Sequence, residues 1–150
     1  MYISALRTAS ETRVYSPRAC LDNLKQLGAA FALYLDANGA YPPADKWMDE
    51  ITLYLRAGDL PKEEQEKKLR CPDLPYHPDT YGYALFRSLS GKWADEIPEP
   101  EKQVVVFDSS NLSRNANDDL ESLPNPPRHG GNNALYADGR SAPVKSTKTK

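Results

Sequence analysis

Apolar residues recur at three- and four-residue intervals after Pro17, and this periodicity is the strongest structural signal in the chain. It predicts an amphipathic helix from about Ser16 to Asn38. Ser16 is suited to the cap position, Pro17 to the first helical position, and Gly39 to the left-handed conformation that ends a helix. Gly28 disfavours the helix by roughly 1 kcal/mol relative to alanine, which indicates a close backbone contact there. The apolar positions are Cys20, Leu24, Leu27, Phe31, Tyr34 and Leu35.

A second, shorter helix is predicted after a proline turn. Asp45 is expected to cap it and Gly58 to end it. The charged segment 61–70 is expected to be solvated, with a helical turn at most. The apolar face of this second helix contains Trp47, Ile51, Tyr54 and Leu55.

From Cys71 onward, apolar and polar residues alternate, which is typical of strands. Asp138 and Gly139 form a two-residue hairpin signal of type I′, and Pro143 confines the strand that follows to a sheet edge. A long polar loop, 108–131, separates two of the strands. The predicted strands are 80–86, 102–110, 132–138 and 140–144.

Helices followed by strands predict an α+β fold, in which an N-terminal helix packs on a small antiparallel sheet of three to four strands. Thirteen prolines and eight glycines indicate a loop-rich chain. The expected core pairs the helix residues Leu24, Leu27, Phe31 and Leu35 with Val104, Val106, Leu135 and Tyr83.

Composition narrows the classes of function. The net charge of -2, from 19 basic and 21 acidic residues, gives no basic footprint for nucleic acid or an anionic membrane. No apolar stretch approaches the ~20 residues that span a bilayer. No serine stands on a G-x-S-x-G elbow, and neither histidine has an evident oriented partner, so the sequence predicts no catalytic residue and no enzyme.

The stretch "CLDNLKQLGAAFALYLDANGAYPP", together with "CP" at 71, "YGYA" at 81 and "RHGGNNALYADGR" at 128, resembles a known family. It is similar to bacterial type IV pilin-like proteins and type II secretion pseudopilins, in particular prepilin-type proteins with a C-terminal His…Asp-Gly motif. The resemblance covers roughly 18–144. It implies a pilin-like fold and a structural subunit of a pilus or pseudopilus fibre.

The resemblance also implies an organisation, a location and partners. Residues 1–16 are expected to be a remnant of the family's long N-terminal helix or a linker, 17–144 the globular domain, and 145–150 a disordered tail. The expected location is the periplasm or cell surface, with inner-membrane anchoring, before assembly, through a segment that is absent here. The implied partners are other pilin-like subunits, which bind through the N-terminal helix, and a prepilin peptidase that processes the precursor.

The His…Asp-Gly motif is interpreted as architecture. Gly130 and Gly131 permit a sharp turn, His129 is expected to pin the long loop to the sheet, and Asp138-Gly139 sets the last hairpin. Eight residues separate His129 from Asp138, one fewer than the family usually has.

Cys20 and Cys71 are the two cysteines of the chain. Their spacing matches no zinc motif, and two cysteines alone make a poor metal site. A disulfide between them is expected if the protein is exported, and two buried thiols are the alternative.

The preferred interpretation of the 108–131 loop is an ordinary polar loop without metal or cofactor. One alternative is a calcium site of hard oxygen ligands, because type II pseudopilins bind calcium in such a loop. A second is a small extracytoplasmic binding module that uses the loop for a ligand or carbohydrate. The candidate calcium ligands are Asp108, Asn117, Asp118 and Asp119, with Asn111 and Asn115.

Overall fold

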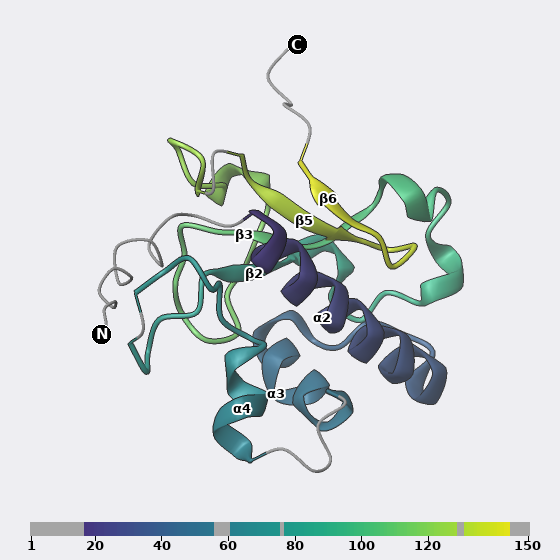
Figure 1. The fold of residues 1–150 in the computed structure, drawn as a ribbon. Coiled ribbons are helices and arrows are strands. Elements are labelled where there is room, and N and C mark those ends of the chain that lie inside the picture. The colour runs from purple at the N-terminus through teal and green to yellow at the C-terminus, as the bar shows by residue number, and fades with distance from the viewer. Residues whose placement is uncertain (1–16, 56–60, 76, 129–130, 145–150) are drawn as a thin grey trace, which may run out of the picture.

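The computed structural model describes residues 17–55, 61–75, 77–128 and 131–144, and in these residues helices precede one mixed sheet (Figure 1). The expected α+β class is confirmed. The helices are α2 (Pro17–Asn38), α3 (Trp47–Ile51) and α4 (Lys62–Lys67), and short 3-10 turns flank α3. The strands are β2 (Tyr83–Phe86), β3 (Val104–Asp108), β4 (Asn117–Asp118), β5 (Asn133–Tyr136) and β6 (Ser141–Pro143).

The helix α2 begins and ends where the sequence predicts. Pro17 is its first residue, and Gly39, with φ +79°, follows its last. The Gly39 N–H donates to the Leu35 carbonyl at 2.7 Å, which satisfies one of the last carbonyls of the helix. Its buried residues are Cys20, Leu24, Leu27, Ala30, Phe31 and Tyr34, and Leu35 is partly buried.

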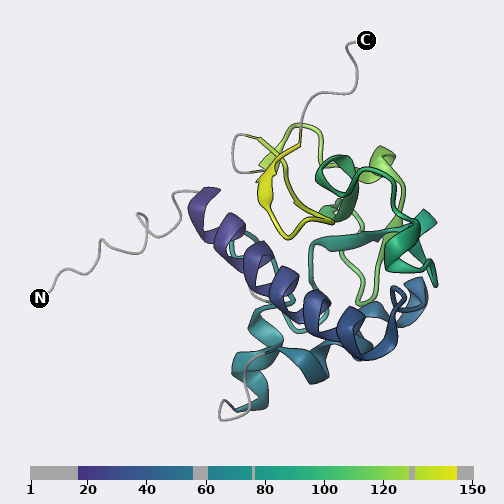
Figure 2. The ribbon, with the colours of Figure 1, turned by 90° about the vertical axis from the view of Figure 1, so that its right-hand side faces the viewer.

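The buried face of α2 lies against β5 and β6 (Figures 1 and 2). At Gly28 an added Cβ would lie 2.8 Å from Leu135 Cδ1, so the close contact predicted from this glycine is confirmed. The Ser141 hydroxyl donates to the Leu21 carbonyl at 2.9 Å. Leu135 and Tyr83 share the α2 core, as expected. The helix α2 is therefore fastened to the hairpin of β5 and β6.

The expected antiparallel sheet of three to four strands is too small. The sheet has five strands in the order β4-β2-β3-β5-β6, and β4 pairs parallel with β2 through Leu85 with Asn117 and Phe86 with Asp118. The sequence missed β4 because a two-residue strand inside a polar loop carries no alternating pattern. The edge position expected for Pro143 is confirmed, since β6 ends the sheet.

Val104 does not pack against α2 as expected. The pairing of β3 with β5 shifts register between Val104 and Val106, which marks a bulge. Val105 and Val106 consequently face the α2 core, whereas Val104 lies with Phe107 on the other side of the sheet. A bulge changes which face a residue points to, so alternation alone misplaces it.

The hairpin between β5 and β6 has a three-residue loop, Ala137 to Gly139, and the two-residue turn expected here is wrong. The Tyr136 N–H donates to Arg140 O at 2.8 Å, and the Gly139 N–H donates to Tyr136 O at 2.9 Å. Gly139 has φ +92°, whereas Asp138 has no positive φ. A type I′ turn requires positive φ at both central residues, so the loop is a type I turn that ends on a left-handed glycine.

The capping of α3 also differs from expectation. Its N-cap position is Lys46, without a side-chain cap, and Asp45 lies in the preceding 3-10 turn. The side chain of Asn115 supplies the cap instead: its Oδ1 accepts the Met48 N–H at 2.6 Å and the Asp49 N–H at 3.3 Å. No local pattern around α3 can reveal a cap that comes from a distant loop.

Several predictions concern residues outside the described ranges, among them His129, Gly130, Gly58 and the segments 1–16 and 145–150. Within the described residues, no helix combines the length and the apolar character needed to cross a membrane.

Candidate functional site

Three buried side chains meet where the start of α2, the loop before β2 and the end of β3 come together. Cys20, Cys71 and Asp108 each place a sulfur or carboxylate oxygen there, and these atoms lie within 4.8 Å of one another. Cys20 and Asp108 are 0% exposed and Cys71 is 2% exposed. A buried carboxylate needs partners because it has left water, so this cluster is the strongest candidate site in the described structure.

Asp108 is held by three groups. Its Oδ2 accepts the Asn133 N–H at 2.8 Å, and the Cys20 thiol donates to Oδ1 at 3.7 Å. Arg128 Nη1 lies 3.4 Å from Oδ1, with its side chain only 10% exposed. The negative charge of Asp108 is therefore balanced inside the protein by a cation that is itself largely shielded from water.

Arg128 also fastens the long loop to the sheet. Its Nη1 donates to the Gly82 carbonyl at 3.0 Å, and its Nη2 donates to the Ser109 carbonyl at 2.7 Å. This is the clamp that the sequence interpretation assigned to His129, which lies outside the described residues. Nothing in the local pattern distinguishes Arg128 from other loop arginines, so its role could not be predicted from the sequence.

The surroundings keep the Cys20 thiol protonated. A hydrogen bond with Cys71, burial, and the nearby charge of Asp108 together raise the pKa of Cys20 well above its usual range. Burial and the same neighbouring groups raise the pKa of Tyr83, whose hydroxyl lies 3.6 Å from the Cys20 sulfur. A thiol is a far weaker nucleophile than a thiolate, so the unmodified Cys20 is unreactive here.

Cys20 and Cys71 are thiols that are not joined by a disulfide in this structure, and their sulfurs belong to the same 4.8 Å cluster. The structure thus brings together the two residues that the sequence pairs, from the start of α2 and from the loop before β2. The disulfide stays a prediction. The two sulfurs lie near each other, as both a disulfide and a pair of buried thiols require.

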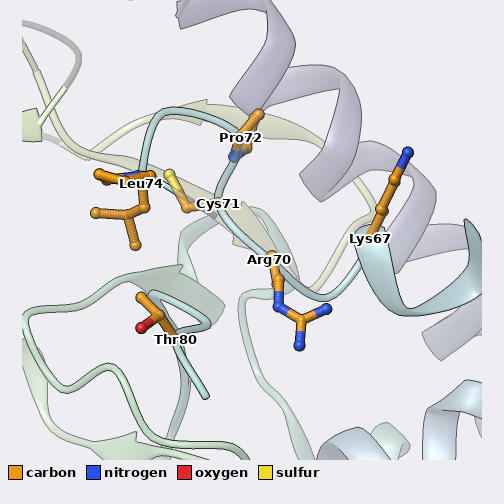
Figure 3. A pocket seen from close by; sticks show the side chains of 7 residues that line it. Lys67, Arg70, Cys71, Pro72, Leu74 and Thr80 are labelled. Carbon is orange, nitrogen blue, oxygen red and sulfur yellow. The ribbon is translucent and has the colours of Figure 1, made fainter. Parts of the chain in front are cut away.

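A cavity of about 230 Å³ lies beside the cluster, and Cys71 forms part of its wall (Figure 3). Lys67, Arg70 and Thr80 give it polar groups, while Leu74 and two prolines give it an apolar side. Cys20 is not among its lining residues. Small solutes therefore approach the cluster from the Cys71 side.

The candidate calcium ligands do not share one centre. Arg87 Nη2 lies 2.9 Å from Asp118 Oδ1, and Arg87 Nε donates to Asn117 Oδ1 at 3.1 Å. Asp119 accepts the N–H of a neighbouring 3-10 turn, and Asp108 lies in the buried cluster. The cation that Asn117 and Asp118 hold in this structure is thus the guanidinium group of Arg87.

Other residues of the loop fasten it to α3 and α4. Arg114 Nε donates to Asp49 Oδ1 at 2.8 Å, and its Nη1 donates to Glu66 Oε1 at 2.9 Å and to the Tyr81 hydroxyl at 3.0 Å. Asn115 Nδ2 donates to Asp49 Oδ2 at 3.0 Å. The polar side chains that suggested a ligand-binding loop form contacts within the domain.

The described part of the His…Asp-Gly motif makes turn contacts. The Gly131 N–H donates to the Arg128 carbonyl at 3.1 Å. Asp138 Oδ1 accepts the Arg140 N–H at 3.0 Å, and its carboxylate lies 3.6 Å from Arg140 Nε. The structural role of the whole motif stays a prediction, because His129 and Gly130 lie outside the described residues.

Comparison with protein-family models, with curated proteins and with solved structures found no match.

Proposed function

We propose that this chain is a structural subunit of a pilus-like or pseudopilus fibre, of the type IV pilus or type II secretion kind. The observation that carries the proposal is the position of α2. This 22-residue helix precedes the whole sheet, and one face is buried against the β5–β6 hairpin. A helix that is fixed to its own domain along one face keeps its opposite face available for neighbouring subunits.

The exposed face of α2 supports this use. Ala29, Ala32 and Leu33 are exposed midway along the helix, and Leu33 is 42% exposed. Small side chains allow the helices of neighbouring subunits to approach closely, and a leucine among them supplies apolar area. In the proposed fibre these positions contact the α2 helices of adjacent subunits.

The proposed pilin-like function also includes a location, partners and a structural role. The domain is extracytoplasmic, in the periplasm or at the cell surface. Its partners are further pilin-like subunits, and a prepilin peptidase acts on a longer precursor. The role is structural, and the buried cluster at Asp108 serves first to hold α2, β3 and the long loop in one arrangement.

Replacement of Leu33 by aspartate tests the proposal. When the natural gene is expressed in the native host and the cells are treated with a chemical cross-linker, the wild-type protein should form a series of multimers in the envelope fraction. The Leu33→Asp variant should lose these multimers. Its melting temperature as a purified domain should change by less than about 3 °C, since exposed positions contribute little to stability.

Leu112→Asp is the matched control, because Leu112 is a leucine of similar exposure, 37%, in the long loop. It should leave the multimers intact. A wild-type protein without multimers, or equal effects of the two variants, would contradict the proposal. Loss of multimers in Leu112→Asp alone would place the contact on the loop.

A further inference from the structure

The cluster of Cys20, Cys71 and Asp108 has the composition of a metal site as well as that of a structural contact. Thiolate sulfur and carboxylate oxygen are both ordinary ligands of zinc. The three residues come from separate segments, so their sequence spacing shows no metal motif. Two cysteines alone are a poor site, but the fold adds a third ligand atom within 4.8 Å.

We propose that the reduced chain binds one zinc-class divalent cation through Cys20 Sγ, Cys71 Sγ and one carboxylate oxygen of Asp108. The inference is independent of the proposed fibre function, because it rests only on the geometry and charge of the buried cluster.

The distances suit one tetrahedral ion. Zinc–sulfur bonds of about 2.3 Å and zinc–oxygen bonds of about 2.1 Å place a sulfur and an oxygen ligand about 3.6 Å apart. Cys20 Sγ lies 3.7 Å from Asp108 Oδ1 and 3.9 Å from Oδ2. Side-chain adjustments of a few tenths of an ångström therefore bring Cys20 and Asp108 to ligand positions. The Cys71 sulfur lies within 4.8 Å of both, so it reaches its own position by a movement of at most about 1 Å.

The charge balance also suits a divalent cation. Without metal, two neutral thiols, the Asp108 carboxylate and the Arg128 guanidinium sum to zero. On binding, two S–H bonds break, two protons leave to solvent, and two metal–sulfur bonds and one metal–oxygen bond form. The two positive charges of the metal replace those of the two protons, so the buried region stays neutral, which avoids the cost of a net buried charge.

Groups around the cluster can orient the ligands. The Asn133 N–H and Arg128 hold the carboxylate of Asp108, as hydrogen-bonding neighbours do for carboxylate ligands in metal sites. Asn133 Nδ2 is buried and lies beside the Cys20 thiol. It is an available donor beside the cluster, and thiolate sulfurs accept such bonds.

The route to the cluster passes Cys71, which lines the cavity in Figure 3. Lys67 and Arg70 line the same cavity and repel a cation, so we expect slow uptake. Because a disulfide consumes both sulfurs, the metal site and the predicted Cys20–Cys71 bridge are alternative states. The oxidised protein, in which the disulfide occupies both sulfurs, is therefore a control that should not bind the metal.

The test uses the full chain, reduced with a phosphine and freed of metal. Cobalt(II), added alone, should give a thiolate-to-cobalt absorption band in the near ultraviolet and the visible bands of a tetrahedral ion, saturating at one equivalent. Zinc should remove these bands, since zinc binds such sites more tightly than cobalt. Native mass spectrometry should show a gain of one zinc and a loss of two protons.

Substitutions identify the ligands. Cys20→Ser should abolish the thiolate band, and Asp108→Asn should weaken zinc binding at least tenfold. Asp95→Asn, which changes an exposed aspartate, should bind zinc as wild type does. Since Asp108→Asn leaves Arg128 without its carboxylate and can unfold the domain, thiol alkylation of wild type gives a second measurement. Zinc should slow the alkylation of Cys71, which lines the cavity, at least tenfold.

A folded, reduced wild type that takes up no stoichiometric metal at micromolar concentration overturns the proposal. So does metal binding without a thiolate band, or equal binding by the oxidised and reduced forms.

Discussion

At the scale of single residues, Gly82 and Gly139 have the same unusual backbone in very different surroundings. Both have positive φ, +98° and +92°. A Cβ at Gly139 would meet nothing within 4 Å, whereas one at Gly82 would lie 2.5 Å from Leu74 Cδ1 and 3.1 Å from Cys71 Cβ. Gly82 thus permits the close approach of the loop that carries Cys71, while Gly139 only completes a turn.

An alanine series separates these two effects. Gly139→Ala should lower the free energy of unfolding by about 1–2 kcal/mol, the cost of a left-handed backbone. Gly82→Ala should lower it further, because the neighbouring side chains must move as well. Gly131→Ala is the control, since its surroundings are open and its φ is not positive. Urea denaturation measures all three, and a Gly139→Ala variant as stable as Gly131→Ala would contradict the assigned turn.

The ion pair of Asp108 with Arg128 leads to a second prediction at the scale of single residues, which concerns the free energy of unfolding. Arg128→Met leaves a buried carboxylate without its cation and should lower the free energy of unfolding by about 3–5 kcal/mol. The exposed pair of Arg87 with Asp118 provides the comparison, because its arginine side chain is 59% exposed. Arg87→Met should lose less than about 1 kcal/mol. Equal losses in chemical denaturation would mean that Asp108 does not depend on Arg128.

At the scale of elements, the short helix α3 is stabilised from outside itself. Its cap is the side chain of Asn115, a residue with φ +60° in the long loop. Arg114, the residue before it, binds both α3 and α4 through Asp49 and Glu66. The loop and the two short helices therefore stabilise one another.

Asn115→Gly isolates the contribution of the cap. Glycine keeps the positive φ and removes only the side chain, so the free energy of unfolding should fall by about 1–2 kcal/mol, the usual loss for a helix cap. Amide exchange should become faster at Met48 and Asp49, whose N–H groups lose their acceptor. Unchanged exchange at these two amides would show that Asn115 does not cap α3.

The contact of Asp49 with Arg114 predicts a pH dependence. Burial acts to raise the pKa of Asp49, but hydrogen bonds from Arg114 and Asn115 outweigh it and hold the pKa below its ordinary value. A carboxylate with a lowered pKa in the folded state stabilises the fold at neutral pH. That contribution is lost as the pH falls from about 4 through the folded-state pKa.

Asp49→Asn should therefore make the protein less stable at pH 7 and less sensitive to acid. The difference in unfolding free energy between pH 7 and pH 3 should shrink by less than about 1 kcal/mol, because the carboxylate is half exposed. A larger acid sensitivity in the variant than in wild type would contradict the direction of the shift.

The elements that the sequence predicts well are those whose signals are local. The period and both end signals of α2 lie within one stretch, and the alternation in β5 places Leu135 and Tyr136 on opposite faces, as observed. The errors involve distant partners. The bulge at Val104 depends on pairing with β5, and the cap from Asn115 depends on tertiary contact.

In the candidate site, too, some residues are identifiable from the sequence and others depend on distant contacts. Cys20 and Cys71 are identifiable from residue type, because cysteines are few. Asp108 and Arg128 are not, since their roles arise only when β3 and the loop are in place beside α2.

At the scale of the whole molecule, the cysteine pair joins the start of the domain to its middle. If the protein is exported, Cys20 and Cys71 are expected to form a disulfide that closes a loop of about fifty residues. It should stabilise the fold by roughly 4 kcal/mol in the chain-entropy model. Protein purified from the envelope, then denatured and alkylated without reductant, should keep both cysteines unlabelled by mass, because denaturation exposes buried thiols but leaves a disulfide intact. Labelling of both thiols would rule the bridge out.

The fastening of α2 to β5 and β6 has a consequence for how the chain folds. The bond from Ser141 to Leu21 spans 120 residues, and part of the surface that covers the apolar face of α2 is made by the last strands in the sequence. Contacts between distant residues form slowly, because a long loop must close before they contribute. During synthesis from the N-terminus, α2 is made before β5 and β6, the strands against which it packs. A chain that stops before β5 contains all of α2, α3, β2 and β3 but lacks the hairpin against which α2 packs, so the core around α2 is completed only when the last strands have been made.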